Sequence, residues 1–171
     1  PDFDQIMMGS EGSFGVLVNV TLKIFRWMPG NRRRYSYMFK NWDDAVEACR
    51  EIMQCECGYP SVFRLSDPEE TDVAMKLYHI EGTPADTFLK ITGYQPMQKC
   101  LLLGLTDGEH GYARNVHRKI RQICRRHGAF NISFAPVVSN WEKGRFRDPY
   151  MREDLEDFGI LIDTLECAVT W

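Results

Sequence analysis

Hydrophobic and polar residues alternate in several short stretches, a pattern typical of half-buried β-strands. The first covers residues 15–25, where one side of an extended backbone carries Val16, Val18, Val20, Leu22 and Ile24. Further strands are predicted at residues 34–39, 61–65, 99–105, 130–138 and 159–169. The strand at 99–105 is apolar along its length, so we expect it near the centre of a sheet.

Between these strands, apolar residues recur at helical spacing, which places them on one face of a helix. Asn41 and Asp67 are expected to cap two helices, because their side chains can accept hydrogen bonds from the first backbone N–H groups. The longest helix is predicted over residues 109–127, and its inward face is Ala113, Val116, Ile120, Ile123 and Cys124. A short helix is predicted near residues 150–157. Glycine and proline interrupt residues 80–97, where no element is assigned.

The order of these elements predicts two split β-α-β units after residue 30. We therefore expect an α+β fold, a ferredoxin-like antiparallel sheet with helices on one face. The length of 171 residues suits one globular domain with a sizeable core. A hydrophobic content of 44% and a charged content of 26% exclude a disordered chain. No apolar run approaches the roughly 20 residues of a membrane-spanning helix.

The formal net charge of −3 argues against a generic binder of nucleic acids or other polyanions. Two basic clusters nevertheless stand out, residues 32–34 and the set Arg118, Lys119, Arg121, Arg125 and Arg126. The second set falls opposite the apolar face of its helix and is interpreted as a solvated surface. The alternative function is a ferredoxin-like RNA-binding or regulatory interaction module without catalysis. The strands at 99–105 and 130–138 lack the aromatic string of RNA-binding sheets.

The cysteines are Cys49, Cys55, Cys57, Cys100, Cys124 and Cys167. Most of them lie inside apolar patterns, where a reduced cysteine behaves as a small hydrophobic residue. Cys55 and Cys57 have a poor spacing for zinc and no matching histidine pair, so no metal site is predicted. Buried reduced thiols and a cytoplasmic location are the expectation.

A glycine-rich loop directly precedes the first predicted strand, with the sequence Gly9-Ser10-Glu11-Gly12-Ser13-Phe14-Gly15. Glycine permits positive φ and lets a ligand approach backbone N–H groups closely. Ser10 and Ser13 add hydroxyl donors suited to phosphate. The order of elements does not fit a dinucleotide-binding β-α-β fingerprint, and no Lys-Ser/Thr pair makes it a P-loop. The spacing alone is more typical of a structural turn.

The longer string from Met8 to Leu17, followed by Val20-Thr21-Leu22-Lys23-Ile24, resembles the GSEGTLGVI…VTLK segment of FAD-linked oxidases of the vanillyl-alcohol oxidase type. Ser13 and Phe14 stand where that family usually has Thr and Leu. The resemblance implies a flavoenzyme with FAD as its cofactor. It assigns FAD contacts to Gly9, Ser10, Glu11, Gly12, Ser13, Phe14, Gly15 and Val16.

The sequence Tyr150-Met151-Arg152, with Glu166 and Trp171 after it, resembles the YIRD…E…ET…W stretch of the alkyldihydroxyacetonephosphate synthase branch of this family. The resemblance implies that residues 1–26 are the tail of a PCMH-type FAD-binding domain. Residues 27–171 are then a substrate-binding cap domain, incomplete at its C-terminus. We therefore expect a fragment, inactive alone, of an enzyme that acts on an organic acid, an alcohol or a phosphorylated glycerone-type substrate.

Arg152 matches the family arginine that holds the anionic head of the substrate, a role that suits the paired donors of a guanidinium. The competing interpretation is a surface arginine paired with Glu153 or Glu156. Asp163 and Glu166 interrupt an apolar strand and are interpreted as members of a salt-bridge network, with an active-site wall as the alternative. For the whole protein the resemblance implies a small-molecule substrate, no nucleic acid, a homodimer and peripheral membrane association.

Overall fold

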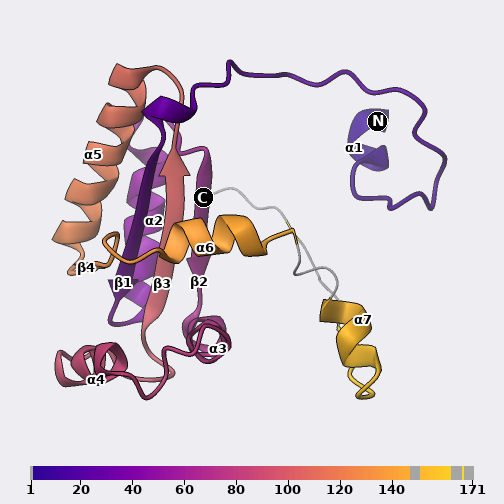
Figure 1. Ribbon diagram of the computed structural model, residues 1–171. Coiled ribbons are helices and arrows are strands. Elements are labelled where there is room, and N and C mark those ends of the chain that lie inside the picture. Colours follow the sequence, from indigo (N-terminus) through magenta and orange to yellow (C-terminus); the bar gives the residue numbers. More distant parts are fainter. Residues whose placement is uncertain (1, 147–150, 163–166, 168–171) are drawn as a thin grey trace.

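The computed structural model describes residues 2–146, 151–162 and 167 and contains an antiparallel sheet with the strand order β2-β3-β1-β4 (Figure 1). Its strands are β1 (Arg33–Phe39), β2 (Val62–Ser66), β3 (Cys100–Thr106) and β4 (Phe130–Asn131). β3 pairs with both β1 and β2, so the central position predicted for the apolar strand is confirmed. The register places Arg33 opposite Thr106 and Phe39 opposite Cys100.

Helices α2 (Trp42–Gln54) and α5 (His110–Arg126) cover one face of this sheet (Figure 1). Asn41 caps α2 as predicted, since its Oδ1 accepts a hydrogen bond from the N–H of Asp44 at 2.8 Å. The predicted inward residues of α5 are all buried. Except for Ala113, they belong to the main core together with Tyr35, Tyr37, Phe39, Ala45, Ala48, Cys49, Ile52, Cys100 and Leu102. The ferredoxin-like α+β fold is therefore confirmed.

Helices α3 (Pro68–Leu77) and α4 (Pro84–Ile91) connect β2 to β3 and lie at one end of the sheet (Figure 1). The predicted cap of α3 is confirmed, because Asp67 Oδ1 accepts from the N–H of Glu70 at 2.7 Å. α4 occupies the stretch that the pattern left unassigned, and Thr83 caps it. A second core cluster joins these helices to the sheet through Met38, Met75, Leu89 and Tyr94.

The strand predicted at residues 130–138 is wrong beyond its first two residues. β4 pairs only with Tyr37 and Met38. The Ser133 hydroxyl then takes the place of a strand backbone, accepting from the N–H of Ser36 at 2.9 Å and donating to its carbonyl at 3.1 Å. Pro136 has no N–H for a ladder, and the chain turns there into α6 (Val137–Gly144). α6 crosses the face of the sheet opposite α2 and α5 (Figure 1).

The strand predicted at residues 15–25 is also not formed. This segment is extended but pairs with no described residue, and its apolar side chains are exposed, with Val18 at 91%. Alternation specifies an extended backbone, whereas a strand also needs a neighbour for its hydrogen bonds. The short helix α1 (Phe3–Met7) precedes the segment, and the 3-10 turn η1 (Pro29–Asn31) leads from it into β1.

At the other end of the chain, the short helix predicted near residues 150–157 is confirmed as α7 (Met151–Glu156). Residues 160–162, where the last strand was predicted, have no regular structure, and residues 163–166 and 168–171 lie outside the described part of the chain. Asp163 and Glu166 are therefore also outside it. No helix in the described ranges is both long and apolar enough to span a bilayer.

The prediction of buried reduced thiols is confirmed for some of the cysteines and wrong for others. Cys49, Cys100 and Cys124 are buried thiols, as expected. Burial raises the pKa of Cys49 to about 12 and that of Cys100 to about 11, which keeps both thiols protonated and unreactive. Cys167 is exposed instead. Cys55 and Cys57 form a disulfide with a Cα–Cα distance of 5.3 Å, so the expectation of reduced thiols is wrong for this pair.

Candidate functional site

The glycine-rich loop is a tight, irregular turn that follows α1. Gly9 and Gly12 have φ values of 78° and 82°, and Glu11 between them has 50°. Ser13 N–H donates to the carbonyl of Ser10 at 2.8 Å and closes the turn. The glycines are needed here for their backbone conformation, because no atom approaches a Cβ built on Gly9 within 4 Å.

This loop presents open hydrogen-bond donors. In the described part of the chain, the N–H groups of Gly12, Phe14 and Gly15 have no protein partner, nor do the hydroxyls of Ser10 and Ser13. Successive backbone N–H groups in turns with positive φ form concave sites for anions. The donors that the sequence singled out are therefore brought together in one exposed turn.

A second polar cluster ties the start of β1 to α6, on the sheet face away from α2 and α5. The Arg32 guanidinium lies 3.0 Å from Glu142 and 3.4 Å from Asp107. Arg34 Nε lies 2.5 Å from the other oxygen of Glu142. The ring of Trp27 stacks 4.9 Å from the Arg32 guanidinium. This network holds α6 against the sheet and fixes the point where the N-terminal segment joins it.

A shallow hollow of about 260 Å³ lies beside this network, between β1 and the segment before α6. Arg34 is its only charged lining residue, and Phe134, Pro136 and Val138 supply apolar surface. Sequence reasoning missed both the hollow and Glu142. The signal that pointed to them was Pro136, which predicts a break in the strand and lets α6 turn back over the sheet.

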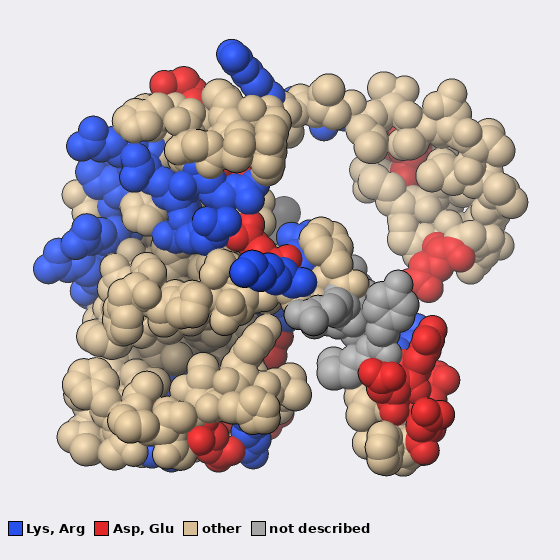
Figure 2. All heavy atoms as spheres, in the orientation of Figure 1, with Lys and Arg blue, Asp and Glu red and all other residues tan. Residues whose placement is uncertain are grey.

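Arg152 lies on α7 and is exposed. Glu153 and Asp154 occupy the first turn of the same helix, and Figure 2 shows acidic side chains gathered over it. In Figure 1 both α7 and the N-terminal segment lie away from the sheet. The structure therefore does not bring Arg152 to the Arg32–Glu142 network.

Lys and Arg side chains gather over α5 (Figure 2). Within the described residues, no carboxylate pairs with Arg33, Arg114, Arg118, Lys119, Arg121 or Arg125. Most of these side chains are exposed, which agrees with the predicted solvated face. His117 sits beneath them, and burial together with the charges of Arg33 and Arg121 lowers its pKa. This histidine is therefore neutral at physiological pH.

Comparison with protein families gives a match that covers most of the chain. Residues 28–171 match the family described as FAD linked oxidases, C-terminal domain. The chain belongs to this family. The match starts one residue before η1, so it includes the sheet, its helices and the Arg32–Glu142 network.

Several proteins of known sequence match the chain at low identity. Alkyldihydroxyacetonephosphate synthase from Dictyostelium discoideum is 24% identical over 99% of the chain, and the protein of that name from Caenorhabditis elegans is 26% identical over all of it. The FAD-linked oxidoreductase YgcU of Escherichia coli K12 is 27% identical over 82% of the chain. The chain spans 25% to 30% of the length of these relatives.

A solved alkyldihydroxyacetonephosphate synthase structure superposes with a TM-score of 0.69. It is 23% identical and covers 91% of this chain, which in turn covers 29% of that structure. This similarity independently supports the fold described above, and the family match supports membership of a family of flavin-linked enzymes.

Proposed function

We propose that the chain is part of a FAD-dependent oxidoreductase similar to alkyldihydroxyacetonephosphate synthase. The observation that carries the proposal is the cluster of unpartnered donors in the glycine loop, which lies N-terminal to a domain of the FAD-linked oxidase family. In this proposal residues 1–26 belong to the FAD-binding domain and residues 27–171 to the cap domain. The start of the family match at residue 28 supports that division.

Bound FAD would supply the redox chemistry, because the flavin ring accepts and returns electrons. The protein's contribution is to hold the cofactor and orient the substrate. The backbone N–H groups between Gly9 and Val16 would bind the cofactor's phosphates, and the hydroxyls of Ser10 and Ser13 would add donors. These neutral backbone and hydroxyl donors would hold the phosphates of FAD without a charged side chain.

Replacement of Gly12 by Ala in the whole protein is expected to reduce bound flavin about tenfold. A Cβ at this left-handed position costs roughly 1–2 kcal/mol and displaces the loop's N–H groups. The measurement is the flavin absorbance of the purified protein per polypeptide. Gly82→Ala is the matched control, because Gly82 has a similar φ of 77° and lies in the turn before α4. A colourless wild-type protein that is otherwise folded would disprove the cofactor assignment.

Arg152 is proposed to bind the anionic head of the substrate. Its guanidinium can form paired hydrogen bonds with a carboxylate or a phosphate. The proposed substrate is the one that the sequence resemblance implies, which is an organic acid, an alcohol or a phosphorylated glycerone-type compound. The relatives named for alkyldihydroxyacetonephosphate synthesis support the phosphorylated member of this class.

Arg152→Met in the whole enzyme is expected to lower kcat/KM about 10- to 100-fold, the usual loss for a charge-assisted hydrogen bond. Flavin content is expected to stay unchanged, because the substituted side chain lies on α7 and not in the glycine loop. Steady-state kinetics and flavin absorbance measure the two effects. Arg50→Met, on the solvent side of α2, controls for the loss of one positive charge. Unaltered kinetics in Arg152→Met would identify a surface arginine.

One feature of the fold argues against the alternative of an RNA-binding module. Modules of this fold stack bases on the sheet face opposite their helices. Here α6 crosses that face, and the Arg32–Glu142 ion pair fixes it there (Figure 1). Homodimer formation, peripheral membrane association and cytoplasmic location stay predictions for the whole protein.

A further inference from the structure

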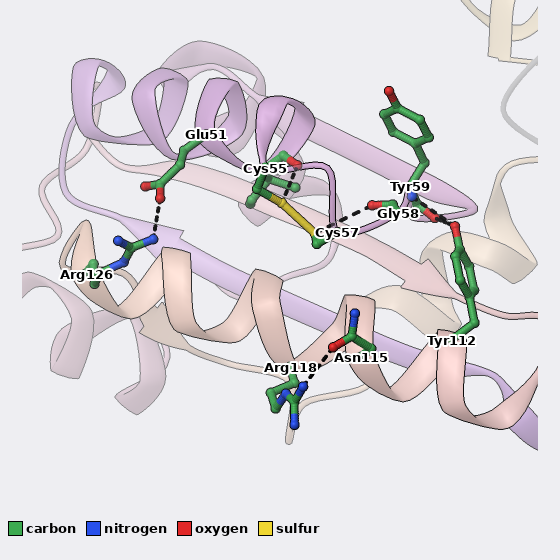
Figure 3. The surroundings of a disulfide bond; sticks show 10 residues. Glu51, Cys55, Cys57, Gly58, Tyr59, Tyr112, Asn115, Arg118 and Arg126 are labelled. Carbon is green, nitrogen blue, oxygen red and sulfur yellow. Dashed lines mark hydrogen bonds and ion pairs between the residues drawn. A yellow bond between two sulfur atoms is a disulfide. The ribbon is translucent and has the colours of Figure 1, made fainter.

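The Cys55–Cys57 disulfide lies between the C-terminal end of α2 and the facing side of α5 (Figure 3). Both cysteines are only partly buried, so solvent reaches the pair. Neither belongs to the glycine loop or to the Arg32–Glu142 network. The disulfide is thus a reactive group that the proposed flavin chemistry does not use.

A groove of about 490 Å³ opens beside the disulfide. Its lining is Glu51, Cys55, Lys119, Gln122, Ile123, Arg125 and Arg126. The cations outnumber the single carboxylate, and Arg126 together with His127 already pairs with that carboxylate. The hydrogen bond from His127 and then the Arg126 contact lower the pKa of Glu51, so this acid stays ionised.

Lys119 and Arg125 are left in the groove without a carboxylate partner among the described residues. Both are exposed side chains on α5 that can turn toward a ligand in the groove. The groove therefore attracts an anion and places it next to Cys55. A carboxylate-bearing molecule can form charge-assisted hydrogen bonds to both cations.

We propose that this groove is a thiol–disulfide exchange site for a low-molecular-weight thiol that carries carboxylates. The thiol binds through its carboxylates to Lys119 and Arg125, which brings its sulfur to the Cys55–Cys57 bond. The proposal is independent of the flavin assignment.

In the exchange, the ligand thiol first loses its proton to solvent, and the thiolate attacks Cys55 Sγ. A bond forms between the ligand sulfur and Cys55, the Cys55–Cys57 bond breaks, and its electron pair stays on Cys57 as a thiolate. Cys55 is the C-cap of α2, at the negative end of the helix dipole, so the departing charge is better placed on Cys57. A second ligand thiolate then attacks the ligand sulfur, which yields the protein dithiol and the ligand disulfide.

The turn around the disulfide is itself constrained. Glu56, between the two cysteines, has a φ of 51°, a left-handed conformation that is unfavourable for a residue with a side chain. Opening the disulfide removes the constraint that holds it there. Next to the pair, Tyr112 of α5 accepts from the N–H of Tyr59 at 2.9 Å and donates to its carbonyl at 3.0 Å. These two hydrogen bonds, drawn in Figure 3, keep residue 59 in place when the disulfide opens.

The test uses the whole protein, equilibrated with a mild oxidant, with glutathione as the anionic thiol and cysteamine as a cationic one. Peptide mass spectrometry after alkylation follows the mixed disulfide at Cys55 over time. Glutathione is expected to form this mixed disulfide at least about fivefold faster than cysteamine, compared per thiolate, since each exposed ion pair contributes up to about 1 kcal/mol. The Lys119→Gln/Arg125→Gln variant is expected to lose this preference.

Lys76→Gln/Lys143→Gln is the matched control, because it removes the same charge from α3 and α6 and leaves the groove intact. It is expected to keep the wild-type preference. The substituted side chains are exposed, and far-ultraviolet circular dichroism verifies that all variants are folded. Free thiols at Cys55 and Cys57 after oxidation, or the same glutathione preference in both double variants, would overturn the proposal.

Discussion

Gly104→Ala is expected to lower the free energy of unfolding by about 3 kcal/mol, the upper range for an overpacked core. Gly104 lies in the central strand β3, and a Cβ there would overlap the carbonyl oxygen of Val62 and the hydroxyl of Tyr35. The Tyr35 hydroxyl donates to that carbonyl at 3.0 Å, so the added methyl group also breaks a partly buried hydrogen bond. Backbone atoms on the neighbouring strand cannot move aside without disturbing the pairing of β2 and β3.

Urea denaturation of the wild-type and variant chains measures this loss. Gly30→Ala is the control, because no atom lies within 4 Å of a Cβ at Gly30 and its φ is not positive. That variant is expected to unfold at the wild-type urea concentration. A Gly104→Ala protein as stable as Gly30→Ala would contradict the close approach of β2, β3 and Tyr35.

Lys99→Met is expected to destabilise the chain by about 3 kcal/mol, as when one partner of a buried ion pair is removed. The Lys99 side chain is only 2% exposed and pairs with Asp72, whose side chain is 15% exposed. Asp72 also accepts from the N–H of Met97 at 2.6 Å, which joins α3 to the turn before β3. Without the ammonium group, the carboxylate remains partly buried with this one neutral donor.

A second substitution separates the charge effect from lost packing. Asp72→Asn in the Lys99→Met background is expected to recover stability, because a neutral amide needs no counter-ion and can still accept from Met97. Arg64→Met is the exposed control. Its pair with Glu70 is nearly half exposed on both sides, so its loss is expected to cost less than about 1 kcal/mol. Equal unfolding midpoints for Arg64→Met and Lys99→Met would contradict the buried role of Lys99.

The parts of the fold that local chemistry determines could be predicted from the sequence. Asn41 and Asp67 cap helices through hydrogen bonds that reach only three residues along the chain. The apolar face of α5 follows from helical spacing alone. α4 was missed although Thr83 and Pro84 provide the signals of a helix start, because the surrounding glycines suggested a loop.

The errors in the strand predictions have a different origin. Alternation in residues 15–25 describes the side chains of an extended segment but not whether another strand lies beside it. In residues 130–138 the ladder ends after Asn131, where the Ser133 hydroxyl takes the hydrogen bonds of Ser36, and α6 begins after Pro136. Pairing is a property of two segments, and the pattern of one segment does not contain it.

The candidate site also has parts that local sequence predicts and parts that depend on residues far apart in the chain. The glycine loop is contiguous, so its donors could be recognised in the sequence. The Arg32–Glu142 ion pair joins residues 110 positions apart, and the Lys99–Asp72 pair joins residues 27 apart. Nothing local marks these partners. The Cys55–Cys57 pair was visible as a spacing, but only the fold shows the cationic groove beside it.

The shortness of β4 has a consequence for how copies of this domain meet. Because β4 pairs only with Tyr37 and Met38, the first half of β1 has no strand on that side within the described residues. An unpaired strand edge is a template for the edge strand of another molecule. Here Arg33 stands at that edge without a carboxylate partner among the described residues, so a second copy in the same position would bring two such guanidinium groups together. Like charges at a strand edge disfavour edge-to-edge pairing between copies.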